Sequence, residues 1–173
     1  MKTRHELHAY DYVNFSYPAV RDALLDDAVV TLERATVVAA RRAESIGAEL
    51  RATVGGVTVG AAIEIELVRI QTAIGPGGRP ATNLTLRWGA AEHASLFPTM
   101  SAVLSIYPLT ATETQLDLSG TYSPPLGLVG EALDALVLHH LAKESVAGFI
   151  QSVAKFLREQ LSLPVDARPA LHG

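Results

Sequence analysis

Apolar and polar side chains alternate along the first part of the chain. From Glu6 to Phe15 every second residue is apolar, except that Asp11 occupies one of the apolar positions. A period of two indicates a strand with one buried face. Pro18 ends this strand and can begin a helix, which we expect over Ala19 to Leu25.

The next stretch has a helical period and is followed by a return to alternation. From Asp27 to Ile46 apolar residues recur at steps of three and four, which predicts an amphipathic helix ended by Gly47. Residues Leu50 to Val54 alternate again and predict a short strand. The pair Gly55-Gly56 is typical of a tight hairpin turn leading into the next strand.

Four further segments with a period of two complete the middle of the chain. They are Val57 to Ile70, Leu84 to Ala90, Ala102 to Leu109 and Thr114 to Tyr122. The glycine-rich segment Gly75 to Gly78 provides a turn after the first of them. In that strand Arg69 has the same parity as Ile65 and Leu67, so we expect it on the apolar face near the strand end.

A long amphipathic helix is predicted near the end of the chain. Pro124-Pro125 ends the last strand, and an apolar face then continues from Leu128 to Ser162, about 50 Å at 1.5 Å per residue. Three residues add apolar groups on the side that should face water: Leu133, Val137 and Leu141. This excess favours contact with a loop or with a second subunit in a homodimer. Residues 163–173 carry two prolines and no period, and we expect a loose tail.

This order of elements predicts an α+β fold in a single domain over residues 1–173. We expect a curved antiparallel sheet of about six strands, with two short helices after the first strand. The long C-terminal helix would cover the concave, apolar face of the sheet.

Composition narrows the function classes. Of 173 residues 49% are hydrophobic, enough for a substantial core, and the net charge of −4 argues against nucleic-acid binding. The chain contains no cysteine, which excludes disulfides and thiolate metal sites. No apolar run is long enough to cross a membrane and no signal peptide is recognisable, so we expect a cytoplasmic protein without integral membrane association.

The segment leading into the last helix carries a family resemblance. Together with the order of elements, Pro124-Pro125-Leu-Gly127 within Gly120 to Gly130 resembles the START-like, or SRPBCC, superfamily of helix-grip proteins. The resemblance extends from about Glu6 to Leu161. That superfamily includes plant ligand carriers, lipid-transfer domains and bacterial polyketide cyclases. The resemblance implies a cavity for apolar molecules between sheet and helix.

Its iron-containing branch is not supported. The histidines His5, His8 and His93 lack the spacing and context of its metal ligands, and we expect neither a metal nor a cofactor.

Two polar residues on apolar faces are candidates for chemistry. Asp11 is either paired or hydrated at a strand end, or it acts as a general base or as a polar anchor for a ligand. His139 lies on the apolar face of the long helix, whereas His140 faces away. It is either a hydrogen-bonded core histidine or a polar group that orients a ligand or moves a proton.

A set of mostly apolar residues would line the concave surface and bind the ligand, unless these residues simply fill the core. They are Trp88, Tyr107, Tyr122, Leu138, His139, Ala142 and Phe149. The function favoured by these patterns is binding or carrying a hydrophobic, lipid- or polyketide-like small molecule. The alternatives are a cyclase or dehydratase, with Asp11 and His139 as base and acid, and a protein-interaction module.

Overall fold

The computed structural model describes residues 5–54, 63–90, 99–123 and 135–163. The N-terminal part of this region contains strand β1 (His5–Val13), helix α1 (Tyr17–Asp26) and helix α2 (Ala28–Val54). Four strands follow: β2 (Ile63–Ile74), β3 (Pro80–Ala90), β4 (Thr99–Thr110) and β5 (Glu113–Ser123). Helix α3 (Ala135–Ser162) comes last, and a short 3-10 turn, η1 (Pro76–Gly78), joins β2 to β3.

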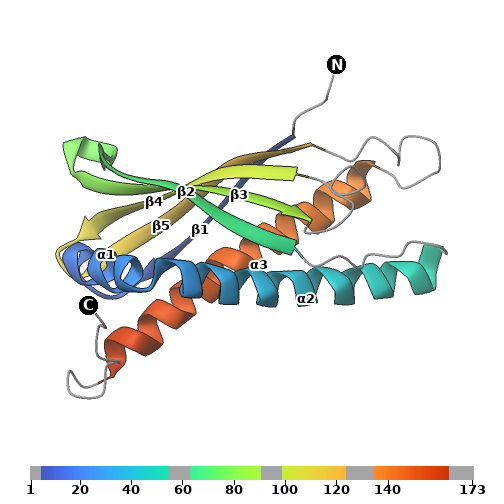
Figure 1. Cartoon of the computed structure of the whole chain (residues 1–173), viewed down its shortest axis with the longest axis horizontal. Helices are drawn as coiled ribbons and strands as arrows, with labels where there is room; N and C mark the ends of the chain where they lie inside the picture. Colours follow the sequence, from blue (N-terminus) through green and yellow to red (C-terminus); the bar gives the residue numbers. More distant parts are fainter. Residues whose placement is uncertain (1–4, 55–62, 91–98, 124–134, 164–173) are drawn as a thin grey trace.

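The five described strands form one antiparallel sheet in the order β1-β5-β4-β3-β2. All three helices lie on the same side of it, and α3 crosses beneath the strands (Figure 1). The alternation in the sequence creates this arrangement, because residues two apart along a strand share one face. Ala9, Leu118, Leu104 and Leu84 are successive partners across four strands, and all four face the helices.

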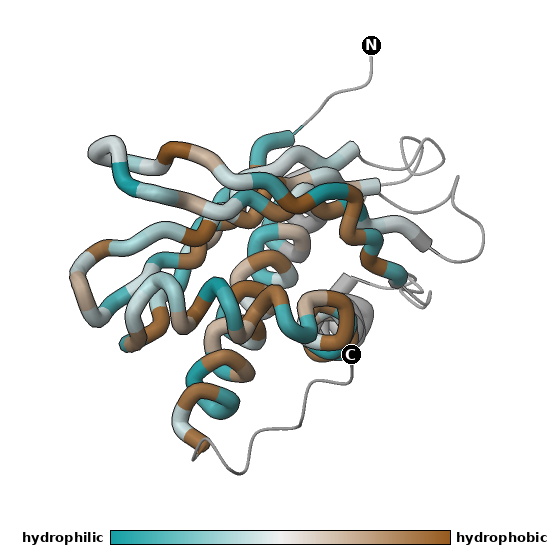
Figure 2. The backbone as a smooth tube through the Cα atoms, turned by 60° about the vertical axis from the view of Figure 1, so that its left-hand side comes forward, coloured by the Kyte–Doolittle hydropathy of each residue, from teal (hydrophilic) through white to brown (hydrophobic). Residues whose placement is uncertain are grey.

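The core lies between this inner face and helices α2 and α3. The side chains of α3 that close it are buried over about three turns of helix: Val146, Phe149, Ile150, Val153, Ala154 and Leu157. Full burial of one large aliphatic side chain stabilises a fold by about 1.5–3 kcal/mol, so this stripe holds α3 against the sheet. Figure 2 shows hydrophobic positions recurring along the strands and helices that enclose this core.

Helix α2 corrects two of the predictions. It continues through Gly47 to Val54, so the predicted strand from Leu50 to Val54 is wrong and the second helix is long rather than short. The segment Ala48 to Ala52 has strong helix formers, and an interior glycine costs a helix only about 1 kcal/mol. The predicted turn at Gly55-Gly56 lies outside the described residues. The described part of the chain therefore contains five strands instead of about six.

A β-bulge changes the face of one predicted inner residue. The pairing of β2 with β3 shifts between Leu67 and Arg69, so that Val68 is an extra residue. Beyond the bulge Arg69 pairs with Thr85 on the outer face and Ile70 pairs with Leu84 on the inner face. The expected inward position of Arg69 is wrong because a simple period of two does not include a bulge.

Candidate functional site

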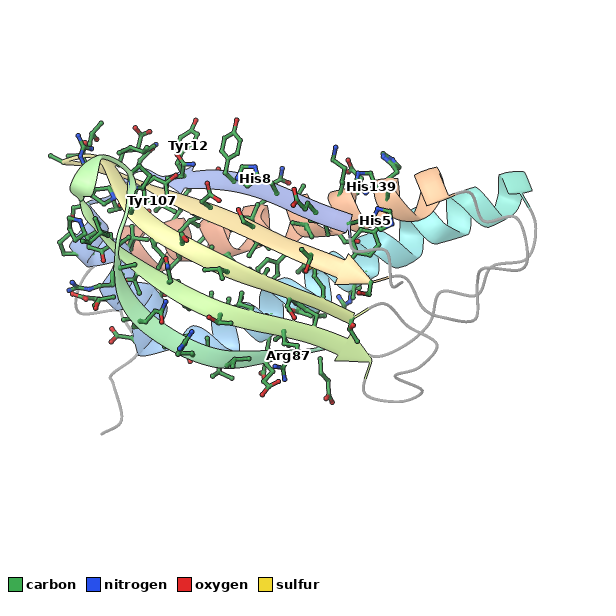
Figure 3. All side chains as sticks on the ribbon, turned by 90° about the horizontal axis from the view of Figure 1, so that it is seen from above. His5, His8, Tyr12, Arg87, Tyr107 and His139 are labelled. Carbon is green, nitrogen blue, oxygen red and sulfur yellow. The ribbon has the colours of Figure 1, made fainter. Side chains whose placement is uncertain are left out.

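Three aromatic rings from three elements meet at one end of the interface between the sheet and α3. They belong to His5 of β1, Tyr122 of β5 and His139 of α3, which we call the ring cluster. The His5 and Tyr122 rings stack with centroids 5.1 Å apart, and His139 lies 6.0 Å from His5 and 6.3 Å from Tyr122. Figure 3 shows His5 and His139 close together at this end.

The strand register positions two of these rings. His5 and Tyr122 are direct partners between β1 and β5, and both are in phase with the buried Leu7. Tyr122 is buried, and loss of water around its phenol raises the pKa of Tyr122 above the ordinary value of 10. Tyr122 therefore presents a neutral phenol at physiological pH, beside the rings of His5 and His139.

His139 has a polar atom without a partner. Its Nδ1 is buried and makes no hydrogen bond to any residue that the structure describes. A buried donor or acceptor left unpaired costs about 1–3 kcal/mol, and such groups in folded proteins call for an explanation. A ligand oxygen or nitrogen at this position would remove that cost. Of the two candidate roles of His139, this arrangement is compatible with the orientation of a ligand.

Apolar side chains extend from the ring cluster across the inner face. Tyr122 pairs with Met100 of β4, which in turn pairs with Trp88 of β3. Trp88 is buried and meets Phe149 of α3 edge to face, with centroids 5.1 Å apart. Ala142, one turn from His139, is partly buried against the same core. The side chain of the remaining α3 candidate, Leu138, lies outside the part of the chain described at side-chain level.

Trp88 is held in a fixed orientation by polar contacts. Its Nε1–H donates to Oγ1 of Thr36 in α2 over 3.2 Å, and that hydroxyl donates to the Leu32 carbonyl over 2.9 Å. A buried indole N–H requires such a partner. Trp88 therefore presents only its apolar surface to the space near the ring cluster.

Tyr107 lies on the other side of the sheet from these residues. Its neighbours Ile106 and Leu104 have the inward parity, and Tyr107 points to the outer face, where its hydroxyl donates to Asp117 Oδ2 over 3.4 Å. His8 and Ser119 contact the other oxygen of Asp117 at 3.0 and 3.3 Å. Figure 3 shows His8 and Tyr107 on this outer surface. The expectation that Tyr107 lines the concave surface is therefore not met, because its parity is opposite to that of the buried β4 residues.

Asp11 faces inward, as its position in the alternation predicts, but it lies far from the ring cluster. Its Oδ1 accepts a hydrogen bond from Arg158 of α3 over 2.9 Å, and Arg158 also donates to the Tyr12 carbonyl. Six strand residues separate Asp11 from His5, about 20 Å of strand, and nineteen helical residues separate Arg158 from His139, about 28 Å. The structure does not bring Asp11 and His139 together.

Sequence reasoning did not select two residues of this region, His5 and Met100. Extending the first alternating segment by one position would have placed His5 in phase with Leu7. Met100 precedes the predicted strand, which starts at Ala102, whereas the observed strand begins three residues earlier, at Thr99. In both cases the strand is longer than the alternation that identified it.

The described residues contain neither a membrane-spanning helix nor a cluster of metal ligands. None of the helices in this part of the chain is long and apolar enough to span a membrane. Among the same residues, no group of three or more histidine, aspartate or glutamate side chains is placed to hold a metal ion.

Comparison with known proteins identifies the fold. No protein-family model matches the chain, and no curated protein matches it in sequence. Among solved structures, the Zhui aromatase/cyclase from Streptomyces sp. R1128 is similar over 96% of this chain and 100% of its own, with 11% identity and a TM-score of 0.50.

Two more distant structures show the same type of similarity. A conserved protein from Geobacillus kaustophilus is 12% identical over 91% of this chain and 97% of its own, with a TM-score of 0.49. Norcoclaurine synthase from Thalictrum flavum is 11% identical over 91% of this chain and 88% of its own, with a TM-score of 0.45. The similarity to the Streptomyces structure shows that the chain has the same fold, the helix-grip arrangement that the sequence predicts, and at 11% identity it shows the fold alone.

Proposed function

We propose that this protein binds a hydrophobic small molecule, lipid- or polyketide-like, between the inner face of the sheet and α3. The observation that carries the proposal is the buried, unpartnered Nδ1 of His139 beside Tyr122 and His5. Polar groups of this kind, few in number and next to apolar surface, are typical of small-molecule sites. The polar end of the ligand would lie at the ring cluster and its apolar part along Met100 and Trp88.

Elementary energetics are compatible with this function. Removing apolar ligand surface from water contributes about 25 cal/mol per Å², so several hundred Å² offset the cost of association and leave micromolar affinity. One hydrogen bond to His139 adds orientation more than affinity, since the net contribution of such a bond is about 0.5–1.5 kcal/mol.

The chain offers a direct test, because Trp88 is its single tryptophan. We expect the fluorescence of Trp88 to fall when the apolar probe N-phenyl-1-naphthylamine is added, with energy transfer to the bound probe. Substitution His139→Ala should weaken binding by up to about tenfold, the loss of one hydrogen bond. The matched control is His140→Ala, because His140 is the exposed neighbour of His139 on the same helix.

A second measurement needs no chosen probe. Native mass spectrometry of the gently purified protein should show an added mass that disappears on denaturation. A protein that carries no added mass and leaves Trp88 fluorescence unchanged with the probe would contradict the carrier function.

An enzymatic function, of the cyclase or dehydratase kind, is the alternative. The similar Streptomyces structure is an aromatase/cyclase, although that likeness concerns the fold. The separation of Asp11 from His139 argues against these two as an acid–base pair, since proton transfer needs groups within about 3 Å of the reacting atoms or one water away. Turnover of a polyketide-like substrate that is lost in His139→Ala but kept in Asp11→Asn would favour an enzyme working from the ring cluster.

The third function considered, a protein-interaction module, depends on Leu133, Val137 and Leu141. The side chains of all three lie outside the described residues. A stable protein partner captured by the wild-type chain, together with no small-molecule binding, would favour that function.

A further inference from the structure

Strand β2 forms an open edge of the sheet. It is the last strand in the sheet order, and among the described residues it pairs on one side only, with β3. The N–H and C=O groups on its other side point away from the sheet. Such an edge is a template for pairing with another extended chain, and natural proteins often protect it with lysine, proline or a short strand. In β2, which has twelve residues, there is neither a lysine nor a proline.

Exposed apolar side chains occur both on this edge strand and on the neighbouring helix α2. Val68 and Ile70 of β2 are each 44% exposed. Helix α2 runs below β2 in Figure 1 and packs against it. Four large apolar residues of α2 are also substantially exposed: Val29, Val30, Val37 and Val38. Exposed apolar groups on adjoining elements mark an interaction surface better than single ones do.

The sequence of β2 is complementary to itself in one antiparallel register. When Glu66 is placed opposite Arg69 of a second copy, the twofold symmetry creates the same charge pair a second time. Residues directly opposite each other on antiparallel strands must lie on the same face of the sheet. Glu66 and Arg69 meet this condition because of the bulge between them. Their partners on β3, Arg87 and Thr85, are two residues apart, so both lie on the outer face. The same register places Ile65 opposite Ile70, and both have inward parity. Opposite charges and β-branched pairs across strands each contribute about 0.2–1 kcal/mol.

We infer that two copies of this chain associate through their β2 edges in this register, forming one continuous sheet across the dimer. The symmetry is that of an isologous pair, in which the same surface of each copy meets itself. A stable interface buries about 800 Å² per partner, more than strand pairing alone supplies. Exposed valines of α2, the helix that packs against β2, would contribute the remainder. This inference is independent of the proposed ligand site.

Cysteine cross-linking tests the register directly, because the natural chain has no cysteine and therefore no background. We expect Glu66→Cys and Arg69→Cys proteins, mixed under mild oxidation, to form a disulfide-linked dimer, since directly opposed Cβ atoms lie about 4.5–5.5 Å apart. Each variant alone should cross-link far more slowly, because neither position faces itself. Cross-linking in the mixture no faster than in the separate pools would overturn the register.

Sedimentation equilibrium tests the association itself. We expect the wild type to form dimers, and Ile70→Lys to weaken them at least about tenfold, because a lysine would be desolvated at the paired edge. The matched control is Tyr10→Lys on the opposite edge strand, where Tyr10 is 64% exposed. Arg69→Glu should also weaken the dimer, and the double variant Glu66→Arg/Arg69→Glu should restore it.

Circular dichroism would verify that each variant is folded. A wild type that stays monomeric at the highest soluble concentration overturns the inference. So does a dimer that Tyr10→Lys disrupts and Ile70→Lys does not.

Discussion

At the scale of single residues, Tyr122 and Tyr107 hold their phenol protons more tightly than tyrosine does in water. Burial is the main cause of the raised pKa at both, and at Tyr107 the charge of Asp117 and the hydrogen bond to it add to the effect. Because these pKa values are raised in the folded state, the unfolded chain ionises first as the pH rises. Stability from both phenols is complete below about pH 10 and is lost as the pH rises through the folded-state values.

We therefore expect an alkaline absorbance titration of the protein to show a late step above pH 10. This step comes from Tyr107 and Tyr122, because the pKa of both phenols is raised above the ordinary tyrosine value. In Tyr122→Phe the late step should shrink, and the fall in unfolding free energy above pH 10 should become shallower. A late step of unchanged size in this variant would contradict the assignment.

The ion pair between Asp11 and Arg158 is the second residue-scale feature with a measurable effect. The Asp11 carboxylate is mostly buried and Arg158 is more exposed. Substitution Arg158→Met would leave that carboxylate without its partner, so we expect a loss of about 1–2 kcal/mol in unfolding free energy by urea denaturation. The exposed pair of Lys155 and Glu159 provides the control. Lys155→Met should change stability by less than about 0.5 kcal/mol.

At the scale of elements, Gly120 marks a place where β4 and β5 approach closely. A Cβ atom added at Gly120 would lie 2.5 Å from the Cβ of Ala102 and 2.6 Å from the Ser101 carbonyl oxygen. Both distances are shorter than a van der Waals contact. The strands β4 and β5 can therefore approach this closely only because Gly120 has no side chain. Glycine within a strand often serves such a close approach or a bend.

We expect Gly120→Ala to destabilise the fold by about 2 kcal/mol or more, which lowers the melting temperature by several degrees in a domain of this size. The control is Gly89→Ala in β3, where an added Cβ has nothing within 4 Å. Gly89→Ala should be neutral or slightly stabilising. Equal melting temperatures for the two variants would show that β4 and β5 adjust freely.

The alternation of side chains was sufficient to predict most of these elements. It identified β1, β3, β4 and β5 to within a few residues, since each has one buried and one exposed face. It could not distinguish the end of α2 from a strand, because Leu50 to Val54 alternates and also suits a helix. It also could not locate the bulge at Val68. The bulge depends on the pairing of β2 with β3, and the sequence around Val68 has no pattern that indicates it.

At the scale of the whole molecule, the sequence predicted which elements form the candidate site more reliably than which residues do. Trp88, Tyr122 and Phe149 face the interior as their periods predict. The contact of His5 with His139 joins residues that are 134 positions apart, and no local pattern contains it. The same holds for Asp11 and Arg158: the sequence identified a carboxylate on an apolar face but not the guanidinium that pairs with it.

The packing of strand β1 against helix α3 has a consequence for biosynthesis. Strand β1 contacts β5 and α3, so its partners are made only after most of the chain has left the ribosome. Until α3 emerges, only α1 and α2 can cover the inner face of the nascent sheet, and contacts between such distant residues form slowly. The growing polypeptide would therefore depend on chaperones until its final helix docks. A premature stop before residue 135 would release an aggregation-prone fragment.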